Sequence, residues 1–253
     1  MKDSKLRFSN RVENYVRYRP AYLPQIVTDL ERNSLLRKNF IIADIGSGTG
    51  ISTKLFLSEG YKCLGVEPNK EMRDAAETFL KEFDKFQSVN GSAEATGLNP
   101  NSVDLITAGQ AFHWFDRKSS KIEFQRILRP GGHVALIWNE RHHTGSVFQK
   151  EYEALLKAYC EDYSKVDYKN VDEAALKRFF SPYRYSIYEC ENSQSFDLEG
   201  LKGRLESSSY CPLPGSVNYE PLMKDLVTLF ENEKKAGQIV FEYRTRVYVG
   251  QLT

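Results

Sequence analysis

The chain has 253 residues, of which 41% are hydrophobic and 13% aromatic, so it can bury a sizeable core. A length between one and two typical domains favours one core domain with an elaboration. The 35 Lys and Arg residues against 34 Asp and Glu leave a net charge of +1, which gives no general attraction to nucleic acid or an anionic membrane. No apolar stretch approaches the roughly 20 residues that span a bilayer. We therefore expect no nucleic-acid partner and no membrane partner.

The four cysteines form no C-x-x-C pair, and the polar N-terminus has no apolar region of the kind that secretory signals carry. These features are typical of reduced, structural thiols. We expect a cytoplasmic protein that is a monomer or a homodimer.

Strands and helices are predicted to alternate over the first 141 residues. An apolar stripe behind Pro24, which suits a first helical turn, predicts the first helix. Further helices are predicted over 49–58, 69–83 and 117–128, and strands over 40–45, 61–67, 102–110 and 133–140. Residues 86–95 are predicted to hold one more strand together with its loop. The segment "RPGG" before the last strand is expected to be a turn. Such alternation predicts right-handed crossovers and a parallel sheet with helices on both faces.

After Glu140 the alternation ends. Helices are predicted over 146–163, 172–180, 197–210 and 219–237, with strand patterns over 183–196 and 238–252. The last segment alternates apolar and polar residues, which is typical of an antiparallel, half-exposed strand.

The segment "ADIGSGTG" places glycines at every second position after a buried strand. Glycine permits positive φ and close approach of a ligand, and the N–H groups that open the next helix attract negative charge. The spacing G-x-G-x-G differs from the dinucleotide fingerprint G-x-G-x-x-G, because Ile51 stands at the third glycine position. A P-loop would also need a lysine after the glycines, and none is present.

Two acids narrow the choice of ligand. Asp44 lies two residues before the first glycine, where an acid repels a pyrophosphate but can pair with an ammonium group. Glu67 ends the second strand, where an acid in Rossmann sheets accepts ribose hydroxyls. The pattern favours a zwitterionic ligand with an adenosine moiety over a plain βα turn without a ligand.

At these positions the chain resembles the class I S-adenosylmethionine-dependent methyltransferases. The segments that carry the resemblance are "ADIGSGTG", "GVEPNKEM", "GSAEATGLNPNSVDLITAGQAFHWF" and "ILRPGGHVALIWNE". Through "YVRYRPAY" and "FEYRTRVYVGQL" the chain is also similar to the subgroup that contains trans-aconitate methyltransferases. The core resemblance covers residues 10–141 and is looser over 142–238.

The resemblance and the predicted elements together imply an α/β fold. We expect a Rossmann-like, doubly wound, seven-stranded sheet, mostly parallel with an antiparallel C-terminal strand, plus a helical substrate cap. Within this single methyltransferase domain, residues 1–39 would form an N-terminal lid and first helix, and 40–141 the cofactor-binding core. Residues 142–238 would be mainly cap, with one core strand near 184–196, and 239–253 the terminal strand.

The resemblance also implies the cofactor, S-adenosylmethionine, with S-adenosylhomocysteine as the product. The residues expected to hold it are Tyr18, Arg19, Asp44, Gly46, Ser47, Gly48, Glu67, Pro68, Asn69, Ser92, Ala93, Glu94 and Gln110. The glycine loop and Asp44 would take the methionine part, Glu67 the ribose, and Ser92–Glu94 the adenine edge. Tyr15 would join Tyr18 and Arg19 in the lid.

The expected reaction is methyl transfer to a small molecule by in-line displacement. Amino-group methyltransferases carry [DNS]-P-P-[YFW] after the fourth strand, whereas this chain reads "GQAFHW", which favours an oxygen acceptor, either a carboxylate or a hydroxyl. A carboxylate needs no base, but a hydroxyl does. His113 is the candidate base, with a mere wall of the pocket as its alternative role, and Trp114 would face the acceptor.

Arg141 and Tyr210 are candidates for binding the acceptor, because arginine forks onto carboxylates and Tyr210 follows a predicted cap helix. No metal is expected, since the adjacent His142 and His143 would point apart and no further ligands complete a set. Two other functions stay open at this point. One is a nicotinamide-dependent oxidoreductase, and the other is a non-catalytic S-adenosylmethionine-binding module on the same fold.

Overall fold

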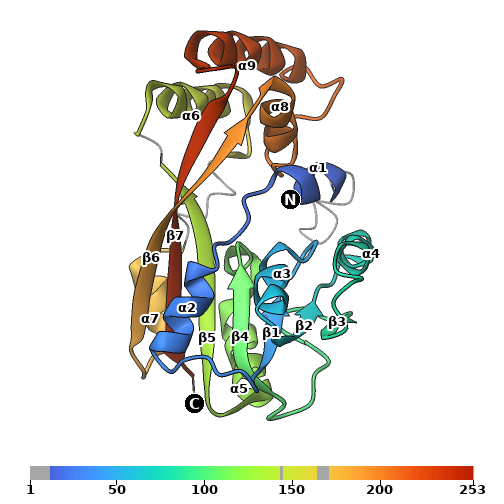
Figure 1. The fold of residues 1–253 in the computed structure, drawn as a ribbon, viewed down its shortest axis with the longest axis vertical. Coiled ribbons are helices and arrows are strands. Elements are labelled where there is room, and N and C mark those ends of the chain that lie inside the picture. Colours follow the sequence, from blue (N-terminus) through green and yellow to red (C-terminus); the bar gives the residue numbers. More distant parts are fainter. Residues whose placement is uncertain (1–11, 143–144, 164–170, 253) are drawn as a thin grey trace.

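The computed structural model describes residues 12–142, 145–163 and 171–252. Its centre is a seven-stranded sheet in the order β3-β2-β1-β4-β5-β7-β6 (Figure 1). The strands are β1 (Ile41–Ile45), β2 (Lys62–Val66), β3 (Phe86–Val89), β4 (Val103–Gly109), β5 (Leu128–Arg141), β6 (Tyr185–Phe196) and β7 (Ile239–Gln251). β7 is antiparallel to both of its neighbours, and the other strands run parallel to one another. The expected fold class is confirmed.

Helices cover both faces of the sheet and build a cap at one end of it (Figure 1). They are α1 (Val12–Tyr18), α2 (Gln25–Arg32), α3 (Ile51–Ser58), α4 (Lys70–Phe79), α5 (Arg117–Ile127), α6 (Val147–Tyr159), α7 (Glu173–Phe180), α8 (Leu198–Glu206) and α9 (Tyr219–Glu233), with the short 3-10 helix η2 (Phe112–Trp114). Several begin at a side chain that accepts a hydrogen bond from the first turn, such as Asn69 in α4 and Asp197 in α8.

The central strands are apolar on both sides because helices cover each face. In β1 and β4 the burial is nearly continuous, whereas β7 alternates between buried and more exposed positions, as its sequence pattern predicts. One apolar cluster lies around Phe112 and Phe124, and a second lies around Phe56 and Tyr61. The two clusters pack against the sheet from its two faces.

The C-terminal ends of β5 and β6 and the N-terminal end of β7 extend beyond the rest of the sheet, and the cap lies on them (Figure 1). There, α6, α8 and α9 contribute to a third apolar cluster, which includes Tyr152, Leu201 and Leu226. The N-terminal helix contacts this cap directly. A Cβ atom at Gly203 of α8 would lie 2.1 Å from the Tyr18 ring, so the glycine makes room for α1.

α7 lies against the core and not in the cap. Phe179 packs edge-to-face on Phe112 and on Phe124, with ring centroids 4.6 and 6.1 Å apart. The region 142–238 therefore supplies a core helix as well as the core strand β6, whereas the sequence suggested only the strand.

The segment "RPGG", which we expected to be a turn, lies within β5. The register between β4 and β5 shifts between Val103 and Leu105, opposite this segment. Residues 129–132 have no partner in β4, because Pro130 has no N–H to donate and Gly131 has a φ of +79°, so they bulge out of the ladder between Leu128 and His133.

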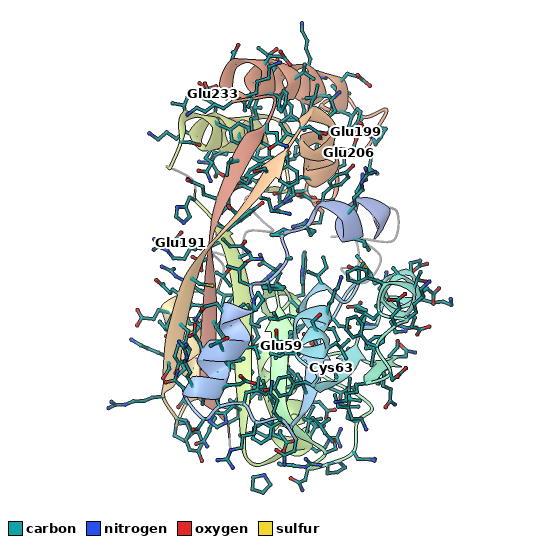
Figure 2. All side chains as sticks on the ribbon, viewed as in Figure 1. Glu59, Cys63, Glu191, Glu199, Glu206 and Glu233 are labelled. Carbon is teal, nitrogen blue, oxygen red and sulfur yellow. The ribbon has the colours of Figure 1, made fainter. Side chains whose placement is uncertain are left out.

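Charged side chains lie mainly on the outside of the fold, while the cysteines lie mostly inside it (Figure 2). Cys63, Cys160 and Cys211 are buried, and none of the cysteines is in a disulfide. Among the residues that the structure describes, no helix has the length and apolar character needed to cross a bilayer.

A buried acid anchors the loop that follows β3. One carboxylate oxygen of Glu123 accepts the backbone N–H of Thr96 at 2.9 Å and also its hydroxyl. Arg126 donates to both carboxylate oxygens at 2.7 Å. The network joins α5 to the loop that carries Ser92, Ala93 and Glu94, so it fixes residues expected to contact adenine.

Replacing Glu123 by Gln should lower the free energy of unfolding at pH 7 by about 1.5–3 kcal/mol, because hydrogen bonds to a charged group contribute on that order. Arg126, together with the Thr96 donors, lowers the pKa of Glu123 to about 2. An acid of this kind stabilises the fold above its unfolded pKa near 4.5 and loses that contribution as the pH falls toward 2. Denaturant unfolding should therefore show the difference between wild type and variant shrinking below pH ~5.

The matched control is Glu82→Gln, at an exposed position, which should change stability by less than about 0.5 kcal/mol. A difference between wild type and Glu123→Gln that stays constant down to pH ~2.5 would contradict the assignment to this carboxylate.

Candidate active site

The segments predicted to bind the cofactor meet at one edge of the sheet. β1, β2, β4 and β5 run parallel, so the residues that follow them lie together at their carboxyl ends. This edge faces α1 and the cap (Figure 1). The glycine loop, the segment after Glu67 and the segment after Gln110 are thus brought together.

The glycine loop is held by backbone geometry. Gly46 and Gly48 have φ values of +67° and +55°, which favour glycine. A Cβ at Gly46 would lie 2.7 Å from that of Ala111, so packing requires this glycine. A Cβ at Gly48 would meet no described atom within 4 Å. Backbone at Gly48 therefore borders open space, as close contact with a ligand requires. The neighbouring Ser47 is buried, and its N–H donates to Val66.

Asp44 lies beneath the loop and is fully buried. Its carboxylate accepts hydrogen bonds from Ser52 and Thr53, both at 2.6 Å, and from Thr107 at 2.9 Å. Burial raises the pKa of Asp44, and the three hydroxyls oppose that rise. The contacts link β1 to α3 and to β4. The expected contact with a ligand ammonium group stays a prediction, and it would have to share an oxygen with one of these hydroxyls.

Glu67 lies beside the loop and is 9% exposed. Its two carboxylate oxygens accept the backbone N–H of Gly48 at 3.0 Å and that of Asn69 at 2.9 Å. Burial raises the pKa of Glu67, and these backbone donors oppose the rise. A carboxylate oxygen has lone pairs for more than one donor. Each oxygen therefore keeps capacity to accept a ribose hydroxyl.

The residues around Glu67 have structural contacts of their own. Asn69 caps α4 by accepting the Met72 N–H at 2.9 Å, and Arg73 donates to the Glu67 carbonyl at 2.8 Å. Pro68 is half-buried between them. These contacts orient the segment where the adenosine pocket is expected.

The loop after β3 closes the same side. Ser92 and Ala95 exchange backbone hydrogen bonds, and Ala93 is buried. Glu94 accepts the Asp116 N–H at 2.9 Å. One oxygen of Glu94 is thus used to hold the start of α5 against this loop.

Gln110 follows β4 with a φ of +54°, which is uncommon for a residue with a side chain. Its side-chain amide donates to the carbonyl of Asn139 at 2.9 Å. Asn139 is itself buried, and its amide lies 3.4–3.5 Å from the carbonyls of Ala21 and Pro20. Asn139 therefore joins the segment after α1 to β5. Sequence reasoning missed this residue, although a polar residue ending the apolar run "VALIW" was a visible signal.

His113 lies in η2 with its ring 4.7 Å from that of Trp114. Its Nδ1 atom is buried, with no hydrogen-bond partner among the described residues. Burial, with a smaller effect of the Arg19 charge, lowers the pKa of His113 to about 4. The imidazole is therefore neutral at pH 7.

The N-terminal lid touches this edge and the cap. Arg19 donates to the Ser207 carbonyl at the end of α8 at 2.8 Å, and its charge reaches His113. Tyr18 packs on α8. The side chain of Tyr15 and the residue His143 lie outside what the structure describes.

Arg141, at the end of β5, points into the cap. It donates to Glu153 at 2.6 Å and to the Tyr163 hydroxyl at 3.0 Å, and it lies over the Tyr152 ring at 4.9 Å. Tyr210 is half-buried, and its ring centroid is 4.9 Å from that of Tyr163. The two candidate acceptor residues are thus brought into one region. Sequence reasoning missed Glu153, which partners Arg141.

His142 points elsewhere, toward Glu191, with 3.3 Å between Nε2 and the carboxylate. Among the described residues, no three His, Cys, Asp or Glu side chains form a group that could hold a metal ion. The expectation of a metal-free reaction stays a prediction.

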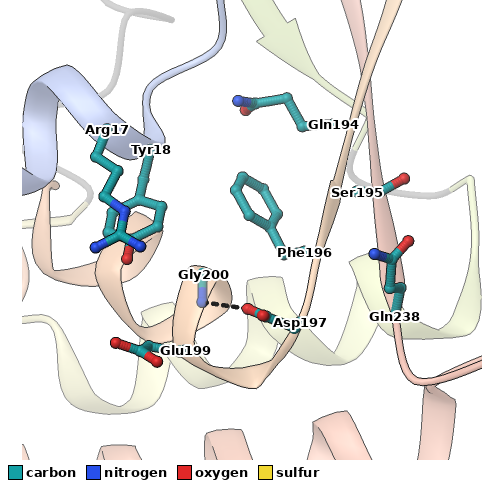
Figure 3. Close-up of a pocket in the computed structure, with 9 residues that line it drawn as sticks. All are labelled: Arg17, Tyr18, Gln194, Ser195, Phe196, Asp197, Glu199, Gly200 and Gln238. Carbon is teal, nitrogen blue, oxygen red and sulfur yellow. Dashed lines mark hydrogen bonds between the residues drawn. The ribbon is translucent and has the colours of Figure 1, made fainter.

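A groove of about 430 Å³ opens between the lid and the cap. Figure 3 shows it between α1, with Arg17 and Tyr18, and the segment that joins β6 to α8. Gln194 and Phe196 form part of its wall. The groove gives solvent access to the region where α1 and the cap meet.

Comparison with known proteins shows what this site is similar to. A family model described as a methyltransferase domain matches residues 43–136. An uncharacterized methyltransferase of Schizosaccharomyces pombe is 26% identical over 247 residues, which is 95% of each chain. An uncharacterized methyltransferase of Mycobacterium tuberculosis is 35% identical over 140 residues, so the match spans 55% of that relative.

A solved structure shares the fold. That of a provisionally assigned type II methyltransferase from Anaeromyxobacter dehalogenans superposes with a TM-score of 0.68 at 18% identity, over 93% of this chain and 98% of that chain. The narrower likeness to trans-aconitate methyltransferases stays a prediction. The family match includes the glycine loop and Glu67, and the full-length relative and the shared fold agree with it, so this part of the chain is similar to methyltransferase domains.

Proposed function

We propose that the protein transfers a methyl group from S-adenosylmethionine to an oxygen atom of a small molecule, and that a carboxylate is the acceptor group that suits the site best. The observation that carries the cofactor assignment is the contact between Glu67 and Gly48, beside open space at the loop. The observation that favours a carboxylate is the setting of His113, whose ring lies 4.7 Å from that of Trp114 and whose buried Nδ1 has no partner among the described residues; burial of this kind lowers the pKa of the imidazole.

The residues present suit this cofactor. Backbone at Gly48 borders open space, and the Glu67 oxygens can each accept another donor. The bound cofactor supplies an activated methyl group on a sulfonium, so alignment and exclusion of water do much of the catalysis. Tyr18 and Arg19, held by α8, would exclude water from above this edge.

A carboxylate acceptor is already ionised at neutral pH, whereas a hydroxyl must lose a proton to a base. An imidazole with a pKa near 4 is a weak base at pH 7. In this proposal His113 therefore walls the acceptor pocket next to Trp114 and does not remove a proton. The absence of the amino-group tetrapeptide from "GQAFHW" supports an oxygen acceptor over a nitrogen acceptor.

Glu67→Gln should weaken binding of S-adenosylhomocysteine at least about tenfold, because it replaces a charged acceptor of two ribose hydroxyls by a neutral amide. Isothermal titration calorimetry measures the change. Glu77→Gln on the exposed side of α4 is the control and should bind like the wild type. Equal affinity in all three proteins would contradict the place given to Glu67, and no binding by the wild type would overturn the cofactor assignment.

Incubation with methyl-labelled S-adenosylmethionine and a set of carboxylic acids, phenols and amines should label carboxylic acids. Methyl esters release labelled methanol in mild alkali, whereas methyl ethers and methylamines do not, so the released methanol identifies the acceptor atom. If the label is stable in mild alkali, the acceptor atom is not a carboxylate oxygen, and the proposed acceptor class is wrong. Binding of the cofactor without any transfer would favour a non-catalytic module.

His113→Asn should keep activity within about tenfold of wild type, since loss of a general base costs about 10²–10⁴. The variant also has a signature in stability. The wild-type imidazole is protonated in the unfolded chain below pH 6.5 but stays neutral in the fold down to about 4. The unfolded state thus binds more protons in this range. As the pH is lowered from ~7 to ~5, the free energy of unfolding of the wild type should therefore decrease more than that of the variant. Urea unfolding at pH ~7 and ~5 measures this difference. A loss of activity above about 100-fold would restore His113 as the base.

A further inference from the structure

A buried group of arginine and tyrosine side chains lies between the cap and the ends of β5 and β7. We call it the arginine–tyrosine cluster and define it as Arg141, Tyr152, Arg204, Tyr210 and Tyr243. Arg141 and Tyr243 lie opposite each other in the β5–β7 ladder, so both project from the same face. Arg204 comes from α8, and its Nε lies 3.4 Å from the Tyr243 hydroxyl. The cluster thus brings two strands and two cap helices together.

The charges of this cluster do not balance. Glu153 pairs with Arg141 at 2.6 Å, and the exposed Lys157 lies 3.5 Å from its other oxygen. Arg204 is only 7% exposed, yet no carboxylate of the described chain forms an ion pair with it. Two buried guanidinium groups therefore face one buried carboxylate. Buried charges are normally paired, and among the described residues the Arg204 guanidinium has no carboxylate to pair with.

One donor of the cluster is also unused within the described chain. The Nε of Arg141 is buried and has no hydrogen-bond partner there. Two tyrosines lie close to it: the Arg141 guanidinium is 4.9 Å from the centroid of the Tyr152 ring, and the Tyr210 ring contacts that of Tyr163, which accepts from Arg141. Burial raises the pKa of Tyr152, so its hydroxyl keeps its proton and stays a donor. Together with Arg204, these groups offer both charge and hydrogen bonds to an oxyanion.

A purely structural role explains Arg204 less well. It lies in the last turn of α8, where a cation is favoured by the helix dipole. That effect operates equally for an exposed side chain and does not require burial. Moreover, Arg204 donates to the Ser208 hydroxyl at 3.1 Å and faces Tyr243, so its guanidinium is directed toward the sheet.

The cluster lies next to the proposed active site. Ser207, beside Arg204, accepts the hydrogen bond from Arg19, whose charge reaches His113. On its other side the Tyr243 hydroxyl donates to Gln194 at 3.2 Å, and Gln194 lines the groove between lid and cap (Figure 3). A ligand at the cluster would thus lie between the groove and the carboxyl edge of the sheet.

We propose that the arginine–tyrosine cluster binds a carboxylate group of the methyl acceptor other than the group that receives the methyl, and that Arg204 selects for acceptors that carry this additional carboxylate. A carboxylate adds one negative charge, which matches the one positive charge in excess, and its two oxygens match the guanidinium fork. The inference rests on the proposed methyltransferase function, because it names the class of acceptor for the same site.

The test uses the whole protein loaded with S-adenosylhomocysteine. Calorimetric titration with succinate at constant ionic strength should show binding to the wild type, while the uncharged succinamide should not bind. In Arg204→Gln the succinate dissociation constant should rise at least about tenfold, since a charge-assisted hydrogen bond is lost. Arg178→Gln, at an exposed arginine of α7, is the matched control and should bind succinate like the wild type.

Thermal unfolding of the ligand-free proteins distinguishes a binding role of Arg204 from a structural one. Arg204→Gln removes an unbalanced buried charge, so its melting temperature should equal or exceed that of the wild type. A clear drop would assign Arg204 to stability and overturn the proposal. If this variant does not fold, Arg204→Lys, which keeps the charge and loses the fork, should still bind succinate more weakly than the wild type. Equal affinity there would also overturn it.

The outcomes separate the two proposals. Failure of the wild type to bind S-adenosylhomocysteine would remove the methyltransferase function itself. Binding of S-adenosylhomocysteine without any binding of succinate would remove only the carboxylate subsite. Binding of inorganic phosphate in place of succinate, lost in Arg204→Gln, would overturn the choice of a carboxylate.

Discussion

One buried carboxylate holds the centre of this fold together. Asp44 has no exposed surface, and its two oxygens accept hydroxyl groups from Ser52 and Thr53 of α3 and from Thr107 of β4. Burial of an acid without such donors would carry a large desolvation cost. The hydrogen bonds from the three hydroxyls offset this cost at Asp44. The result is a fixed angle between β1 and α3, and the glycine loop between them has little freedom to deviate. The loop that carries Gly46 and Gly48 therefore joins two elements that these hydrogen bonds tie together.

The two halves of the site use polar groups in opposite ways. At the sheet edge, acids and backbone N–H groups already satisfy one another, as Glu67 does with Gly48 and Asn69, and a ligand would add further bonds. In the cap, Arg204 lacks a carboxylate partner among the described residues. The first arrangement is satisfied without a ligand and suits the proposed cofactor. The second is incomplete without an anion and suits the selection of one acceptor class.

The fold was largely predictable from local patterns, because strand and helix periods and the glycine spacing reflect contacts close in sequence. The segment "RPGG" was misread as a turn, since proline and glycine signal a break and only the register between β4 and β5 shows that the strand absorbs it. Arg204 was missed because its neighbour Tyr243 lies 39 residues away. Its place between Leu201 and Leu205, on the buried face of α8, was the available signal. Tertiary pairing of this kind leaves almost no trace in a single sequence.

The contact between Tyr18 and Gly203 has a consequence for exchange of small molecules. Because the tyrosine ring occupies the space of a missing side chain, α1 and α8 fit against each other as one surface, and Arg19 ties the same helix at Ser207. Lifting α1 to release a product from the sheet edge would therefore disturb the helix that carries Arg204. Under the proposed function, departure of the spent methyl donor and departure of the methylated acceptor would both require this one movement of α1 and α8.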